Sequence, residues 1–255
     1  MSFTARAARL VNRVIQPLGI KVSGIEQYRD SQRDRLFERV RHFTQTSRER
    51  VSVLCDAIEH VVRNNIKGDF VECDVWRGGS AMAAALTSLD LKGEIRDIHL
   101  FDTFAGMPPT TSEDWEIHTG KPAQHEVGGM PMNLGSLEKV RENMVSTGYD
   151  MTRVHFYQGL VEDTVPMYAP EKIAVLRLDT DWYASTTESS ELRRQAVHGS
   201  GAAPKHELQH LWPRVTVNGF LLIDDYGHYT GAKKAAMNTL RGNHSDYTGR
   251  LVMKS

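Results

Sequence analysis

The chain has 255 residues, with 31 basic and 32 acidic side chains and a formal net charge of -1. This balance argues against nucleic acid as the main partner, because a phosphate backbone demands a clustered excess of basic residues. Hydrophobic residues make up 40% of the chain, and no apolar run approaches the roughly 20 residues of a bilayer span. A transmembrane protein and a disordered chain are therefore both excluded, and one α/β domain with a sizeable core is expected.

The first 65 residues have helical patterns. Leu36, Val40 and Phe43 fall on one helical face, and the spacing of Thr46 and Glu49 is that of a capping box before the next helix. We expect residues 1–65 to form a helical cap and residues 66–255 to form the main domain. An apolar face within residues 1–45 is expected to dock a second copy of the chain, giving a homo-oligomer.

Only two cysteines occur, Cys55 and Cys73, and both have apolar neighbours. Buried free thiols in a reducing compartment are the simplest interpretation, so the cytoplasm is the expected location. No membrane partner is expected.

From residue 69 onward, strand patterns alternate with helical ones. This alternation predicts βαβ units and an α/β fold with a mostly parallel sheet. A long aperiodic stretch at 104–134 is expected to cover the substrate, and 198–205 is expected to be a surface loop. The strands are expected at 70–75, 98–101, 154–157, 173–178 and 220–223, and the helices at 81–89, 136–147 and 232–241.

Acidic side chains lie near the ends of these expected strands. In an open α/β sheet, ligands bind beyond the carboxyl ends of the strands. Several carboxylates that converge there repel one another unless a cation lies between them, and hard oxygen ligands favour Mg²⁺ or Ca²⁺ over zinc. Alternatively, each acid caps a helix or is solvated in a loop. The acids are Glu72, Asp102, Asp179, Asp181, Asp224 and Asp225.

A turn with two glycines, Trp76–Ser80, joins the first expected strand to a helix. Glycines let the backbone approach a ligand closely, and a helix start favours a carboxylate or a phosphate. The turn lacks the pattern GxGxxG and the lysine of a P-loop. Asp102, which ends the second strand, stands where an acid commonly holds ribose hydroxyls. Together these features suggest an adenosine-containing cofactor, either a dinucleotide or S-adenosylmethionine.

His206-Glu207-Leu208-Gln209-His210 fits the zinc-protease pattern HExxH. However, Pro213 follows within one turn, and no glutamate lies downstream to supply a third ligand. The alternative to a zinc site is a helix whose apolar side chains, among them Leu208 and Leu211, pack on the sheet.

Four segments together resemble, in order and spacing, the motifs of the macrocin O-methyltransferase family. The resemblance extends from about Thr46 to about Arg241. Position 74 departs from the family pattern, because it is Asp where the family usually has Gly. The four segments are Gly68–Ser80, Phe101–Pro108, Leu176–Asp181 and Ile223–Gly227.

The resemblance implies a Rossmann-like class I methyltransferase that moves a methyl group from S-adenosylmethionine to a sugar hydroxyl, with Mg²⁺, in bacterial antibiotic biosynthesis. It implies a sugar or glycoside acceptor, Asp181 as general base, and Asp181, Asp224 and Asp225 as metal ligands. An NAD(P)-dependent oxidoreductase and, less strongly, a zinc metalloprotease using His206 and His210 are the alternatives. The implied cofactor-binding residues are Glu72, Gly78, Gly79, Ser80, Asp102, Thr103, Gly159 and Asp179.

Overall fold

A parallel sheet with one antiparallel edge strand organises the protein. The computed structural model describes residues 25–106, 119–121, 126–127, 130–131, 134–179, 203–224 and 250–254. The main sheet has the strand order β5-β2-β1-β6-β7-β8, and β8 alone pairs antiparallel to its neighbour. Its strands are β1 (Asp69–Cys73), β2 (Ile98–Asp102), β5 (Val154–Gln158), β6 (Ile173–Leu178), β7 (Val215–Ile223) and β8 (Arg250–Met253).

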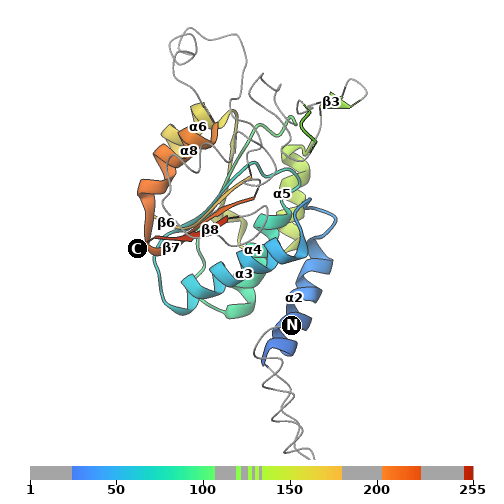
Figure 1. Cartoon of the computed structure of the whole chain (residues 1–255), viewed down its shortest axis with the longest axis vertical. Helices are drawn as coiled ribbons and strands as arrows, with labels where there is room; N and C mark the ends of the chain where they lie inside the picture. The colour runs from blue at the N-terminus through green and yellow to red at the C-terminus, as the bar shows by residue number, and fades with distance from the viewer. Residues whose placement is uncertain are drawn as a thin grey trace, which may run out of the picture.

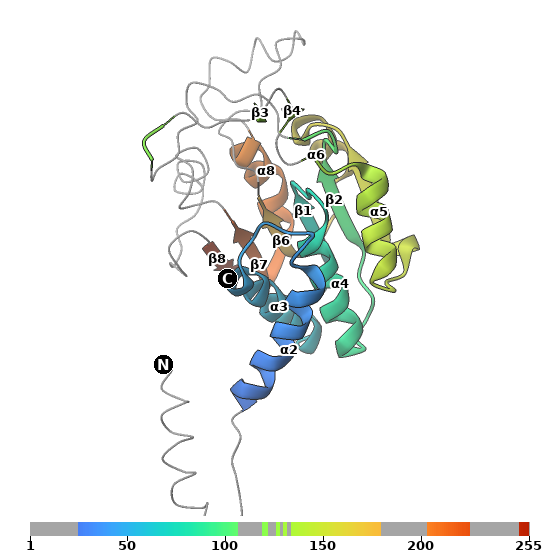
Figure 2. The same ribbon diagram turned by 90° about the vertical axis from the view of Figure 1, so that its right-hand side faces the viewer.

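Helices cover both faces of this sheet. Figure 1 shows α3 and α4 on one side and α6 and α8 on the other, and α2 extends away from the α3–α4 layer (Figure 2). A short pairing of β3 (Glu126–Val127) with β4 (Met130–Pro131) stands apart from the sheet. The helices are α2 (Ile25–Val40), α3 (Arg48–Arg63), α4 (Gly79–Leu91), α5 (Leu137–Ser146), α6 (Val161–Tyr168) and α8 (Ala203–Leu211).

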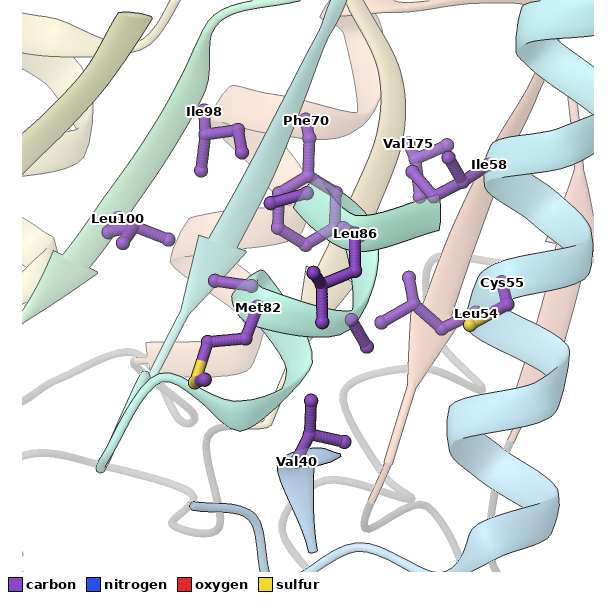
Figure 3. Close-up of a cluster of buried hydrophobic side chains, with 14 of the residues drawn as sticks. Val40, Leu54, Cys55, Ile58, Phe70, Met82, Leu86, Ile98, Leu100 and Val175 are labelled. Atoms are coloured by element: carbon purple, nitrogen blue, oxygen red, sulfur yellow. The ribbon is translucent and has the colours of Figure 1, made fainter. Parts of the chain in front are cut away.

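Two hydrophobic clusters hold the layers together, one on each face. Alternate residues of β1 serve both: Phe70 packs under α3 and α4, whereas Val71 packs under α6 and α8. Figure 3 shows Phe70 among Leu86 of α4 and Ile58 of α3. The two faces are buried because helices cover both sides, as is usual for parallel sheets.

The α/β fold expected from the sequence is confirmed. The fourth strand is found where it was expected, whereas β7 begins at Val215, five residues earlier than the apolar run alone indicated. Helix α6 was missed because its eight residues contain Pro166. The expected helix at 232–241 lies outside the described residues, as does most of the 104–134 stretch. The surface loop expected at 198–205 is wrong at its end, because α8 begins at Ala203.

The helical segment before the sheet joins the core. Leu36 and Val40 are buried as expected, and so are Val51 and Ile58 of α3, in the same cluster as Phe70. The expected cap of α3 was wrong by one residue, because Ser47 and not Thr46 accepts a hydrogen bond from the Arg50 N–H. The oligomeric role of residues 1–45 stays a prediction.

The sequence also predicts buried free cysteines and no membrane-spanning helix. Cys55 and Cys73 are both buried free thiols. In the part of the chain that the structure describes, no helix has the length and apolar character needed to cross a bilayer.

Candidate active site

The carboxyl ends of the parallel strands meet at one rim of the sheet. Register places Glu72 of β1 beside Leu100 of β2 and Arg177 of β6. The backbone continues this arrangement past the strands, because the Asp179 N–H donates to the Cys73 carbonyl and the Asp224 N–H donates to the Leu178 carbonyl. The acids expected at strand ends that the structure describes are therefore neighbours in space.

The β1–α4 turn is built from left-handed backbone. Asp74, Trp76 and Gly78 have φ angles of 64°, 48° and 85°. Left-handed backbone favours glycine and tolerates aspartate better than most residues. Asp74 therefore occupies a left-handed position that glycine would adopt with less strain.

Segments far apart in the sequence hold this turn. The Asn143 side chain of α5 donates to the Arg77 carbonyl at 2.9 Å. A Cβ added to Gly135 would lie 1.9 Å from the Trp76 carbonyl oxygen, so only glycine permits that approach. Neither residue was expected from the sequence, because neither belongs to the turn or to a strand end.

Gly79 has a packing role. Its N–H donates to the Phe43 carbonyl at 2.9 Å, and an added Cβ would lie 2.6 Å from the Phe43 carbonyl carbon and oxygen. Because Gly79 has no side chain, the backbone of the segment that links α2 to α3 can approach it closely. Direct cofactor binding by Gly78 or Gly79 stays a prediction.

Gly79→Ala is expected to lower the free energy of unfolding by about 1–3 kcal/mol, because the new methyl group would overlap rigid backbone. Urea unfolding measures this change. Asp90→Ala, at an exposed position of the same helix, serves as control and should change stability by less than about 0.5 kcal/mol. Equal stability of Gly79→Ala and wild type would contradict the packing role.

Asp102 stabilises the same turn from β2. Its Oδ2 accepts hydrogen bonds from the Val75 and Trp76 N–H groups at 2.6 and 3.1 Å, and its Oδ1 accepts one from the Phe104 N–H at 2.6 Å. Burial raises the pKa of Asp102, although these three donors favour the ionised carboxylate and oppose the shift. Asp102 therefore stabilises the turn from within, and its oxygens keep lone pairs that can accept a hydrogen bond from a further donor.

Arg177 is the centre of a buried charge cluster that the sequence pattern did not indicate. Its Nη1 donates to Glu72 Oε1 at 2.7 Å, and its Nη2 donates to Asp179 Oδ2 at 2.9 Å and to Asp224 Oδ2 at 2.5 Å. The Arg177 side chain is only 5% exposed. Three of the expected carboxylates thus share a cation that the protein itself supplies.

A second arginine approaches from α3. Arg50 Nη1 lies 3.1 Å from Asp224 Oδ1, so each oxygen of this carboxylate has an arginine partner. Burial raises the pKa of Asp224, but the attraction of Arg177 and then Arg50 outweighs it, and the pKa is lowered overall. The helical segment before the sheet therefore contributes directly to the site.

Glu72 is the most buried of the described acids at the rim, at 1% exposure. Burial raises its pKa to about 7, against the opposing attraction of Arg177. Its Oε2 has no hydrogen-bond partner among the described residues. A buried oxygen without a donor is costly, so this atom is suited to a ligand group that can donate.

The remaining expected residues lie at the same rim or outside the described part. Ser80 is buried in the first turn of α4. The Thr103 hydroxyl donates to the Gly106 carbonyl, and the Gly159 N–H donates to the Asp102 carbonyl, both at 3.0 Å. Asp181 and Asp225 lie outside the described residues, so their predicted roles stay predictions.

The HExxH sequence lies on α8, where its histidine rings are 4.1 Å apart. His210 Nδ1 is 2.9 Å from the His206 carbonyl oxygen, and Glu207 is fully buried. Among the described residues, no third acid, cysteine or histidine joins them in a potential metal-binding group. Leu208 and Leu211 pack against the sheet, which agrees with the helix interpretation.

His206 makes stability depend on pH. Burial, and then the neighbouring His210, lower its pKa from 6.5 to about 4. Between these two values the unfolded chain takes up a proton that the folded chain does not, so the free energy of unfolding falls as the pH falls. His206→Gln is expected to reduce the loss of stability between about pH 7 and about pH 4.5 in urea unfolding.

The exposed Gln209 of the same helix provides the control, and Gln209→Ala should keep the wild-type dependence on pH. An unchanged slope in His206→Gln would contradict the role of His206.

The strand order, the glycine turn and the acidic rim together define a class I methyltransferase fold. The solved O-methyltransferase NovP shares this fold with a TM-score of 0.66 and 26% identity over 84% of this chain and 82% of its own. The expected fold class is thereby confirmed.

The chain belongs to the macrocin O-methyltransferase (TylF) family, whose model matches residues 21–246. It is 29% identical to 8-demethyl-8-(2,3-dimethoxy-alpha-L-rhamnosyl)-tetracenomycin-C 4'-O-methyltransferase of Streptomyces olivaceus, over 81% of this chain and 68% of the relative. It is 32% identical to demethyldecarbamoylnovobiocin O-methyltransferase of Streptomyces niveus, over 70% of this chain and 60% of that relative. These relatives favour an O-methyltransferase over the oxidoreductase and protease alternatives.

Proposed function

We propose that this protein transfers the methyl group of S-adenosylmethionine to a hydroxyl group of a sugar, either on a natural product or on its nucleotide-sugar precursor, and that it requires Mg²⁺. The observation that carries the proposal is the cluster of Glu72, Asp179 and Asp224 at the rim of the sheet. The S. olivaceus relative, whose name specifies a rhamnosyl acceptor, supports the choice of a sugar.

The residues at the rim fit both cofactors. Glu72 Oε2 lacks a donor, which an amino or hydroxyl group of S-adenosylmethionine would supply. When ionised, Glu72, Asp179 and Asp224 outnumber the arginines Arg177 and Arg50, and Asp181 and Asp225 follow closely in the sequence. An acidic oxygen-rich set of this kind suits Mg²⁺.

When bound, S-adenosylmethionine supplies the methyl group and Mg²⁺ supplies positive charge that makes a sugar hydroxyl more acidic. In this proposal Asp181 accepts the proton of that hydroxyl at a carboxylate oxygen, as general bases do. Arg177 and Arg50 hold the Asp224 carboxylate in position. The hydrogen bonds that Asp102 accepts stabilise the β1–α4 turn. Positioning of the sugar hydroxyl beside the methyl group contributes the rest of the rate enhancement.

The test combines the protein, S-adenosylmethionine and either a nucleotide deoxysugar or a rhamnosylated polyketide, with Mg²⁺ or with EDTA. Mass spectrometry should detect a singly methylated product of one acceptor in Mg²⁺ and a marked loss of product in EDTA. Methylation that is equal in EDTA would contradict the metal requirement. Methylation of a non-sugar hydroxyl while both sugars stay unmodified would contradict the proposed acceptor.

A further inference from the structure

A second cluster of metal-ligating side chains lies at the opposite end of the strands from the candidate active site. Asp97 immediately precedes β2, His99 is the second residue of that strand, and His155 is its register partner on the edge strand β5. Five residues along β2, or about 16 Å, separate Asp97 from Asp102 at the rim. The cluster is therefore distinct from the carboxylates around Arg177.

The three side chains converge. One ligand atom from each of Asp97, His99 and His155 lies within 4.8 Å of the others. His155 Nε2 is 3.4 Å from Asp97 Oδ2, and His99 Nε2 is 3.4 Å from Oδ2 of Asp69, the first residue of β1. Metal bonds of about 2.0–2.2 Å in a tetrahedral site place neighbouring ligand atoms about 3.4 Å apart, so these spacings match such a site.

Two buried ring nitrogens of this cluster make no hydrogen bond to the described residues. His99 is only 7% exposed, and its Nε2 has no hydrogen-bond partner in the described part of the chain. The same holds for His155 Nε2, although the His155 side chain is 36% exposed and so leaves a route from solvent. Buried ring nitrogens without partners are uncommon, and one ion between them would satisfy both.

Neighbouring groups orient the ligands as they do in metal sites. His99 Nδ1 is 3.0 Å from the Tyr157 hydroxyl, which leaves Nε2 as its coordinating atom. Arg153 pairs with Asp97 Oδ1 at 3.0 Å, so Asp97 Oδ2 remains directed to His155. The rings of His99 and His155 stack at 4.8 Å, which holds both in place.

We propose that Asp97, His99 and His155 bind a borderline transition-metal ion such as Zn²⁺, and that Asp69, whose Oδ2 lies 3.4 Å from His99 Nε2, turns toward the ion as a fourth ligand. Two imidazoles and two carboxylates suit zinc, whereas Mg²⁺ prefers oxygen ligands alone. The ligands come from β1, β2 and β5 and the adjoining Asp97, so the ion links the edge strand to the centre of the sheet. It stabilises this edge and does not take part in methyl transfer.

The test uses metal-free full-length protein titrated with Zn²⁺ and, for its visible absorption, Co²⁺, in excess Mg²⁺ to occupy the oxygen-rich rim. Wild type should bind one Zn²⁺ with an increase in thermal midpoint. His155→Ala and Asp97→Asn should each weaken this binding by at least about tenfold. Tyr157→Phe removes only the hydroxyl beside His99 and keeps every ligand, and it should weaken zinc binding by about tenfold. It tests the site even if the other variants misfold.

His206→Ala is the matched control, because it removes a histidine from the HExxH sequence and should keep the full zinc affinity. Absence of zinc binding by wild type would overturn the proposal. Zinc affinity unchanged in His155→Ala, or lost instead in His206→Ala, would overturn it as well. None of these outcomes depends on methyl transfer, so they are separable from failure of the proposed function.

Discussion

Arg177→Met is expected to lower the free energy of unfolding by about 3–5 kcal/mol, because removal of one partner leaves buried charges uncompensated. Arg177 hydrogen-bonds to three carboxylates while only 5% exposed. Methionine has a similar length and no charge, so the loss of stability reports mainly on these ion pairs. Urea unfolding at neutral pH measures it.

Two further variants sharpen this result. Arg35→Met, at an exposed position of α2, should leave stability within about 0.5 kcal/mol of wild type. Arg177→Lys keeps the charge but not the planar set of donors, so it should recover only part of the loss. If Arg177→Met were as stable as Arg35→Met, the result would contradict the claim that the buried ion pairs of Arg177 stabilise the fold.

Asp181→Asn is expected to lower kcat by roughly 10²–10⁴-fold, because asparagine cannot accept the hydroxyl proton. This prediction rests on the proposed role of Asp181 as general base. Initial rates at saturating acceptor, S-adenosylmethionine and Mg²⁺ measure it, and Asp90→Asn on the exposed face of α4 is the control. Turnover near the wild-type value in Asp181→Asn would rule out this base.

Local pattern was sufficient to locate the five parallel strands of the sheet, although it placed the start of β7 five residues late and did not indicate β8. Buried parallel strands are short apolar runs, and their order along the chain, with helices between them, leaves few alternative topologies. The ends of β6 and β2 therefore came within one residue of expectation. Helix α6 did not, because a proline within eight residues is the usual sign of a break.

The charges of the candidate site were harder to predict. An arginine in the apolar strand Ile173–Leu178 is consistent with an edge or a solvated face, and only the register with β1 brings Arg177 to Glu72. Arg50 reaches Asp224 from a helix more than 170 residues earlier in the chain, which no spacing rule indicates. The sequence located the acids at the rim, whereas their partners follow from tertiary packing.

The two histidines of the second cluster illustrate the same limit. His99 and His155 lie in separate strands with no motif between them, and the pairing of β2 with β5 makes them neighbours. By contrast, HExxH is a familiar motif, yet α8 buries its glutamate against the sheet. Here strand register, and not the short motif, brings three potential metal ligands together among the described residues.

Cofactor binding tests the central claim most directly. The protein would be titrated by calorimetry with S-adenosylhomocysteine and, separately, with NAD, each in Mg²⁺ and in EDTA. We expect micromolar binding of S-adenosylhomocysteine and no binding of NAD. Binding of NAD alone, or of neither compound under any condition, would contradict the assignment of this rim as a methyltransferase cofactor site.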